Sequence, residues 1–275
     1  MNDAQRLKLA QAMARPREWF TVNAAAEIPE ILIYDMIGTD MWGDGMSPKA
    51  FRKELDAVAK KSDKLNLRIN SPGGYVHDGF TIYNALKHSG LEITAYIDGL
   101  AASAASFIAM AAGEIYMPRA SEMMIHNAWG MAFGDAGELR KSADHLDSLT
   151  EKIAAIYVER TGIKKQDVDE MMTAETWMDA DRAVRLGFAS EVMEDMKAAA
   201  CAFDLDIFDN LPGGFIRYQN ALKKRASEQA LRDAGLSRAE AKRRASETET
   251  ESTTEEIQKQ AQNAIQKEIQ KWQII

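Results

Sequence analysis

Ser103 is the first residue whose position suggests chemistry. It stands where an apolar strand, LEITAYIDG, gives way to a short apolar helix, ASFIAMAAG. A serine hydroxyl at such a junction lies near the positive end of the helix dipole, which favours developing negative charge, as an acyl-transfer nucleophile requires. The same position also suits a simple helix N-cap. Ser106 is a rival hydroxyl, but it falls one turn into the helix, where packing is the expected role.

A serine nucleophile needs a general base, and the chain has four histidines. His126 follows the apolar strand EMMI, where it could lean over a cleft or simply be a hydrogen-bonded histidine at the edge of the core. His77 lies in the loop after Gly74 and could line a site. His88 ends a predicted helix and His145 lies among charges on a long amphipathic helix, so both are predicted on the surface.

The stretch INSPGG directly follows the predicted strand LNLRI. Two successive glycines at the exit of a strand let the backbone come close to another group and present bare N–H donors to it. Gly73 and Gly74 are therefore candidates for a binding or catalytic role.

Strands and helices alternate from about residue 29 to 195, which predicts an α/β layered fold with helices packed on a largely parallel sheet. The predicted strands are PEILIYDMIG, KLNLRIN, LEITAYIDG and two short strands in GEIYMPRASEMMIHN around a turn at Pro118. The predicted helices are SPKAFRKELDAVAKK with Ser47 as N-cap, DGFTIYNALKHSG, ASFIAMAAG, residues 137–162, IKKQDVDEMMTA, and a helix that runs into a strand within DADRAVRLGFASEV.

The chain divides into four predicted parts. Residues 1–28 form an N-terminal arm and 29–198 the main domain. Residues 199–245 form a helical extension that is basic between 217 and 244, and 246–275 combine an acidic linker with an amphipathic helix.

The composition excludes several classes of protein. The net charge of −8 argues against nucleic-acid binding by charge alone, and a single cysteine, Cys201, excludes an internal disulfide framework. No signal peptide or membrane-length apolar run is visible, so we expect a cytoplasmic protein without a membrane partner. No residue cluster has metal-ligand spacing and no phosphate-binding loop motif is present, so we expect no metal or organic cofactor.

Three motifs in the same order, INSPGG, GLAAS and MMIHN, resemble those of the proteolytic subunit of the Clp protease family, the ClpP-like serine peptidases. The resemblance covers roughly residues 29–195. It implies a ClpP/crotonase-like fold of repeated ββα layers with a long handle helix at 137–160. It also implies a ring-like homo-oligomer that acts on polypeptide substrates.

The resemblance assigns roles to particular residues. It implies that Ser103 is the nucleophile, His126 the general base, and the N–H groups of Gly74 and Ala104 the oxyanion hole. For the third catalytic residue, the position corresponds to Glu175 where the family usually has an aspartate. Asp179 and Asp181 are nearby alternatives that suit the cap of the following helix. The segments flanking an extended substrate would include Gly73, Tyr75, Asn127 and Trp129.

The sequence MMIHNAWG, followed by ELRKSADHLDSL and ERTG, is similar to Clp-related proteases of phages and prophages that act in head maturation. This branch implies capsid or scaffold proteins as substrates, in the host cytoplasm or inside the assembling prohead. An ATP-driven unfoldase is a further potential partner. Three alternatives stay open: a catalytically silent scaffold subunit, a crotonase-like acyl-CoA enzyme on the same fold, and a serine–lysine peptidase of the signal peptide peptidase type.

Overall fold

The computed structural model describes residues 18–39, 46–193 and 208–212 and the single positions 232, 237, 238, 240 and 242. The chain forms two compact units, Met13–Phe203 and a second made of Met1–Ala12 with Asp204–Ile275. In the second unit, Ser237 Oγ accepts a hydrogen bond from the Glu240 N–H at 3.3 Å, as a helix N-cap does. Most of the predicted parts 199–245 and 246–275 lie outside the described residues.

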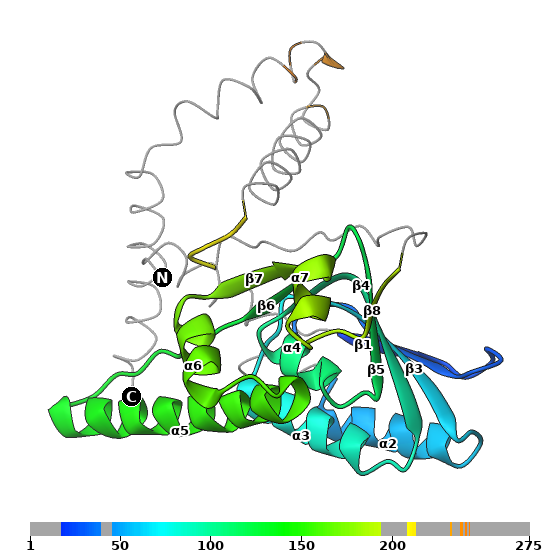
Figure 1. The fold of residues 1–275 in the computed structure, drawn as a ribbon, viewed down its shortest axis with the longest axis horizontal. Coiled ribbons are helices and arrows are strands. Elements are labelled where there is room, and N and C mark those ends of the chain that lie inside the picture. The colour runs from blue at the N-terminus through cyan, green and yellow to red at the C-terminus, as the bar shows by residue number, and fades with distance from the viewer. Residues whose placement is uncertain are drawn as a thin grey trace, which may run out of the picture. The chain divides into compact units, whose positions relative to one another are not determined.

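The unit Met13–Phe203 is a mixed α/β structure, as predicted (Figure 1). Its elements are β1 (Phe20–Asn23), β2 (Glu30–Ile33), α2 (Pro48–Ala59), β3 (Lys64–Ser71), α3 (Val76–Lys87), β4 (Glu92–Ala102), α4 (Ala104–Ala109), β5 (Glu114–Pro118), β6 (Glu122–Ile125), α5 (Ala136–Thr161), α6 (Lys165–Thr173), β7 (Thr176–Asp179), α7 (Ala180–Arg185) and β8 (Glu191–Met193). None of the helices in the described part of the chain is long and apolar enough to cross a membrane.

The sheet is mostly parallel and branches at β4. Within the described residues its strands follow the order β1-β2-β3-β4-β5-β8, and only β1 runs antiparallel to its neighbour on this path. The first part of β4 pairs with β5, whereas its last residues pair with β6, which in turn pairs antiparallel with β7. The carboxyl end of β4 therefore lies beside the short β6–β7 ladder.

Two short strands were not predicted. β1 falls within the stretch predicted as an N-terminal arm (1–28), and Trp19 and Phe20 are buried there. Their ring centroids are 4.8 Å apart and lie 5.8 and 5.3 Å from that of Phe51 on α2. Burying large aromatic rings is worth several kcal/mol, on the order of 1.5–3 for each side chain, which holds this segment to the sheet. The second missed strand is β7, whose four residues TWMD are too few to show a period.

The helix boundaries follow the capping signals in the sequence. Ser47 Oγ accepts a hydrogen bond from the Ala50 N–H at 3.3 Å, and Pro48 begins α2. A capping box of Asp135 with Glu138 begins α5, and Gly162 ends it with φ of 70°. The long helix predicted at 137–162 is therefore present with nearly the predicted bounds.

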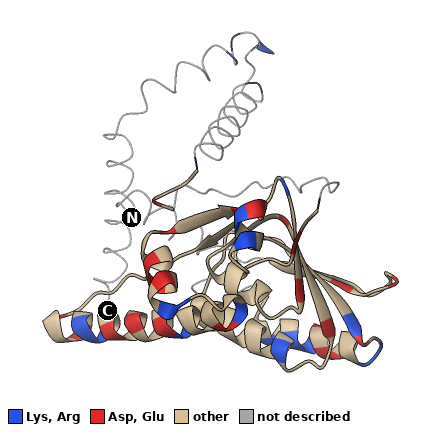
Figure 2. Ribbon diagram, in the orientation of Figure 1, with Lys and Arg blue, Asp and Glu red and all other residues tan. Residues whose placement is uncertain are grey.

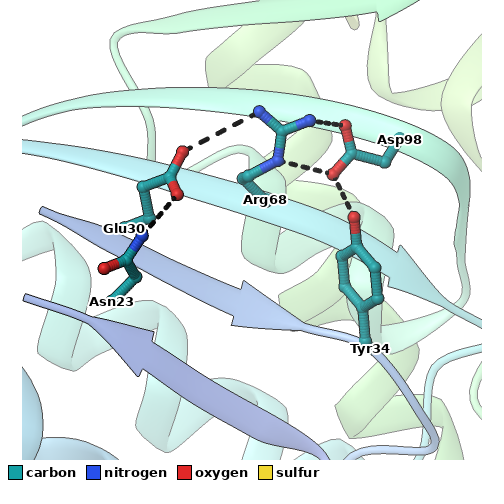
Figure 3. Close-up of polar contacts among 5 residues, drawn as sticks. All are labelled: Asn23, Glu30, Tyr34, Arg68 and Asp98. Carbon is teal, nitrogen blue, oxygen red and sulfur yellow. Dashed lines mark hydrogen bonds and ion pairs between the residues drawn. The ribbon is translucent and has the colours of Figure 1, made fainter. Parts of the chain in front are cut away.

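A polar network joins four neighbouring strands on one face of the sheet (Figure 3). Asp98 on β4 is 1% exposed and accepts hydrogen bonds from Arg68 Nε at 2.9 Å and from the Tyr34 hydroxyl at 2.5 Å. Arg68 also lies 4.0 Å from Glu30, which accepts a hydrogen bond from the Asn23 amide. Burial is the main cause that raises the pKa of Tyr34 to about 12, and the hydrogen bond to Asp98 adds to it.

Candidate active site

Ser103 occupies a sharp turn between β4 and α4. Its backbone has φ of 53° and ψ of −123°, a conformation that costs energy for any residue with a Cβ. Although Ser103 stands at the N-cap position, its side chain makes no capping hydrogen bond, so the simple N-cap interpretation is not supported. A strained serine between a strand and a helix is the arrangement of a nucleophile elbow.

His126 reaches the Ser103 hydroxyl. Its Nε2 lies 2.8 Å from Ser103 Oγ, a hydrogen-bond distance. The contact follows from the sheet, because Ala102 pairs with Met124 and the Ser103 N–H donates to the Met124 carbonyl at 3.0 Å. His126 lies two residues after Met124, directly after the end of β6. When its Nε2 carries no proton, the serine hydroxyl donates to it, and Nε2 can then take that proton during attack.

Glu175 stands beside His126 at the open end of the β6–β7 ladder. The last pair of this antiparallel ladder is Ile125 with Thr176, and His126 and Glu175 are the residues next to this pair in the chain. Glu175 Oε1 also accepts a hydrogen bond from the Trp177 indole N–H at 3.2 Å.

Ser103 and Glu175 also share an unusual backbone conformation. Among the described residues, Ser103 and Glu175 are the only non-glycine residues with positive φ, at 53° and 48°. Strained conformations persist only where the surrounding structure enforces them, and they cluster at functional sites. This observation links the serine and the glutamate independently of any side-chain contact.

The two other candidate carboxylates lie away from this end of the ladder. Asp179 pairs with Glu122 at the opposite end and caps α7 by accepting a hydrogen bond from the Arg182 N–H at 2.7 Å. Asp181 forms an ion pair with Arg119 at 3.1 Å. Asp179 therefore has the helix-capping role expected of it.

Gly73 and Gly74 bring the backbone against the Ser103 turn. A Cβ on Gly73 would lie 2.7 Å from Ser103 Cβ and 2.9 Å from the Ala104 nitrogen, so only glycine fits. A Cβ on Gly74 would lie 2.1 Å from the Ile37 carbonyl oxygen. Gly74 forms a parallel bridge with Ile37, whose N–H donates to the Gly73 carbonyl at 2.7 Å. The SPGG segment is thus held between Ile37 and the proposed nucleophile.

The residues expected to flank a substrate differ in their hydrogen bonds and in their burial. Tyr75 ends the Gly-Gly segment, and its N–H donates to the Ile37 carbonyl at 3.1 Å. The Asn127 side chain donates to Thr173 Oγ1 at 3.2 Å, which ties it to α6. Trp129 is partly buried at the start of an otherwise exposed loop.

The other three histidines lie on the surface. His77 does not line the Ser103 turn through any contact among the described residues; its Nε2 instead lies 3.3 Å from Nε2 of His145 on α5. His88 caps the end of α3, with Nδ1 2.8 Å from the Asn84 carbonyl oxygen. No group of three or more metal-ligating side chains occurs among the described residues.

Sequence reasoning missed the role of two residues beneath the turn. Ser106 was expected to pack, and it is fully buried, but its hydroxyl donates to the Ser103 carbonyl oxygen at 2.6 Å. The same hydroxyl lies 2.8 Å from the hydroxyl of Tyr157 on α5. Tyr157 reads in the sequence as one more apolar position of a helical stripe, so no local signal identifies this contact.

A family model described as Clp protease matches residues 45–196, more than half of the chain. The chain belongs to the Clp protease family. The matched range of this Clp protease family member contains the SPGG segment, the Ser103 turn, His126 and Glu175. Clp family proteins are peptidases, in general of the serine type, and they are typically oligomers with polypeptide substrates.

Proposed function

We propose that this Clp protease family member is a serine endopeptidase with Ser103 as nucleophile, His126 as general base and Glu175 as the third catalytic residue. The observation that best supports the proposal is the 2.8 Å distance between Ser103 Oγ and His126 Nε2 at a strained strand–helix turn. A nucleophile within hydrogen-bond reach of a base is the basic requirement for covalent acyl transfer.

The reaction proceeds through an acyl-enzyme. His126 Nε2 takes the hydroxyl proton while Ser103 Oγ attacks the carbonyl carbon of the scissile peptide bond. The resulting imidazolium gives its proton to the leaving amine, and the ester on Ser103 remains. Water then attacks this ester with His126 again as base, which releases the acid product and restores the serine.

The N–H groups of Gly74 and Ala104 would hold the oxyanion. Gly73 lies directly against the Ala104 nitrogen, which brings the two donor-bearing segments together. No acceptor for either N–H occurs in the ranges that the structure describes, so both are available to a substrate oxygen. Removing one oxyanion donor costs about 10²–10³ in rate in serine proteases, so this pair would account for much of the catalysis.

Glu175 would orient His126 and stabilise its charged form. Glu175 and His126 adjoin the last pair of the β6–β7 ladder, Ile125 with Thr176, which supports this role, and a glutamate can act here as an aspartate does.

We further propose that the substrate is an extended polypeptide bound between the segments that follow Gly74 and His126, through main-chain hydrogen bonds. Assembly into a homo-oligomer would use α5 and the loop before it. Residues 131–141 are all exposed, including Met131 at 48% and Phe133 at 91%. Such apolar side chains on a protruding element fit an interface between copies.

We propose further that the peptidase acts in head maturation of a phage or prophage. This role is supported by the sequence MMIHNAWG with ELRKSADHLDSL and ERTG, and it would make capsid or scaffold proteins the substrates. The place of action would then be the host cytoplasm or the prohead interior. An ATP-driven unfoldase would have to be a separate protein, because the sequence contains no phosphate-binding loop motif.

A fluorophosphonate probe tests the central proposal. The purified full chain should form an adduct on Ser103, located by mass spectrometry, and should cleave an unfolded protein such as casein. Ser103→Ala should abolish both the adduct and the cleavage while leaving assembly intact, and His126→Ala should lower both by several orders of magnitude.

Matched controls are Ser62→Ala and His88→Ala, which remove a serine and a histidine at surface positions. Both should react like the wild type. An assembled oligomer without an adduct would support a silent scaffold subunit instead. Binding of an acyl-CoA without an adduct would support the crotonase-like alternative.

A further inference from the structure

A buried chain of hydroxyls lies beneath the Ser103 turn. Ser106 is 0% exposed and Tyr157 is 1% exposed, and their hydroxyl oxygens are 2.8 Å apart. Ser106 Oγ also lies 2.6 Å from the Ser103 carbonyl oxygen. Buried hydroxyls need hydrogen-bond partners, and here the partners are each other and the backbone of the proposed nucleophile.

The direction of these hydrogen bonds follows from counting protons. A carbonyl oxygen only accepts, so Ser106 must use its single hydroxyl proton to donate to Ser103. Tyr157 must therefore donate to Ser106. Burial raises the pKa of the Tyr157 hydroxyl, so the group keeps its proton and remains a donor at every pH of interest.

This chain of hydrogen bonds ends at the Ser103–Ala104 peptide group, whose N–H is one of the two proposed oxyanion donors. The Ser103 carbonyl and the Ala104 N–H belong to one planar, trans peptide group, so they point in opposite directions. Fixing the oxygen therefore fixes the direction of the N–H. The Ser106 N–H also donates to the same oxygen, at 3.0 Å, so the carbonyl is held by two donors. Hydrogen bonds on the oxygen further polarise the peptide and strengthen its N–H as a donor.

The Ser103 peptide needs such support because its conformation is strained. With φ of 53° at a residue that carries a Cβ, the turn persists only where neighbouring groups enforce it. The Ser103 N–H is fixed by the Met124 carbonyl on one side. Ser106 fixes the carbonyl on the other side, and Tyr157 fixes the Ser106 rotamer.

We propose that Ser106 and Tyr157 are positioning residues that act in series to aim the Ala104 N–H at the oxyanion. This inference deepens the proposed function and rests on it. Neither side chain would touch the substrate. Their effect should thus fall on the chemical step rather than on substrate binding.

Three variants and one control test the inference. Tyr157→Phe removes only the donor hydroxyl, Ser106→Ala removes the hydroxyl that contacts the peptide, and the third variant combines both. Tyr83→Phe is the matched control, because it removes the hydroxyl of another buried tyrosine on α3. The readouts are the rate of fluorophosphonate labelling at Ser103, kcat and KM on a fluorogenic peptide, and thermal unfolding.

Ser106→Ala should lower kcat and the labelling rate about 10–100-fold, less than the loss of a whole oxyanion donor, with KM nearly unchanged. Tyr157→Phe should have a smaller effect in the same direction. Because the residues act in series, the double variant should be no slower than Ser106→Ala alone. The pH at half-maximal rate should stay in place, since His126 is not altered.

The outcomes separate this inference from the proposed function. A wild type that labels at Ser103, together with folded variants that label equally fast, would overturn the positioning role alone. Losses that multiply in the double variant would show that Tyr157 does not act through Ser106. A wild type that never labels would refute the serine peptidase proposal and the positioning role with it. If Ser106→Ala does not fold, the labelling rate of Tyr157→Phe tests the positioning role instead, because this substitution is nearly isosteric. A wild-type labelling rate in Tyr157→Phe would then overturn that role.

Discussion

Glu122 should make the stability of the β6–β7 ladder depend on pH near neutrality. Its side chain is partly buried, and Asp179 stands directly opposite on β7. Burial is the main cause that raises the pKa of Glu122 from 4.5 to about 7, and the negative charge of Asp179 adds to it.

The sign and size of the effect follow from proton linkage. Between pH 4.5 and about 7 the folded protein keeps a proton on Glu122 that the unfolded chain releases. The free energy of unfolding therefore falls as pH rises through this window, and the loss is complete above the folded pKa. The full difference would be about 3 kcal/mol, and solvent screening of a partly exposed side chain reduces it to about 1–2 kcal/mol.

Urea unfolding at several pH values between 4.5 and 8 measures this effect in the wild type, Glu122→Gln and the control Glu54→Gln on α2. Glutamine keeps the shape of the side chain without its charge. Glu122→Gln should thus be more stable than the wild type at pH 8 by about 1–2 kcal/mol, and its stability should change less with pH. Glu54→Gln should follow the wild type. Equal pH dependence in all three proteins would show that Glu122 titrates as an ordinary surface carboxylate.

Four further substitutions test the site and the sheet. Glu175→Gln should lower kcat about 10²–10⁴-fold by weakening the orientation of His126, whereas Glu175→Asp should retain more activity; wild-type rates for both variants would remove Glu175 from the mechanism. Asp98→Asn should lower the free energy of unfolding by about 2–3 kcal/mol, because Arg68 would lose its buried ion partner and keep only the more distant Glu30. Tyr34→Phe should lower it by about 1 kcal/mol, the usual net contribution of one hydrogen bond; equal stability of all three proteins in urea would mean that the network of Figure 3 has no stabilising role.

The sequence was sufficient to predict the elements that meet at Ser103. Strong local signals, such as the Ser47 cap, the Gly162 terminus and the apolar runs of β3 and β4, determine where these elements begin and end. The three motifs predicted that Ser103 and His126 come together, and their side chains are in contact. Their catalytic roles, and that of Glu175, stay predictions that the labelling experiment tests.

The missed features depend on contacts between distant parts of the chain. β7 exists because β6 offers it a partner, and a four-residue strand has no period of its own to read. β1 depends on the packing of Trp19 and Phe20 against Phe51, more than thirty residues away in the sequence. The contact of Ser106 with Tyr157 spans 51 positions, and neither residue type is unusual in a helix. Such pairs become visible only once the helices are placed.

The α5 helix is long, and only its second half contains buried residues. The helix has 26 residues, so it is a rod about 39 Å long, and charges of both signs run along it (Figure 2). Its buried residues, Leu149, Ile153, Ala154 and Tyr157, all lie in its second half, whereas its first half is largely exposed. A stiff rod transmits displacement from one end to the other. A partner bound to the exposed half of α5 would therefore contact the same rigid helix that carries Tyr157, whose hydroxyl lies 2.8 Å from that of Ser106 beneath the Ser103 turn.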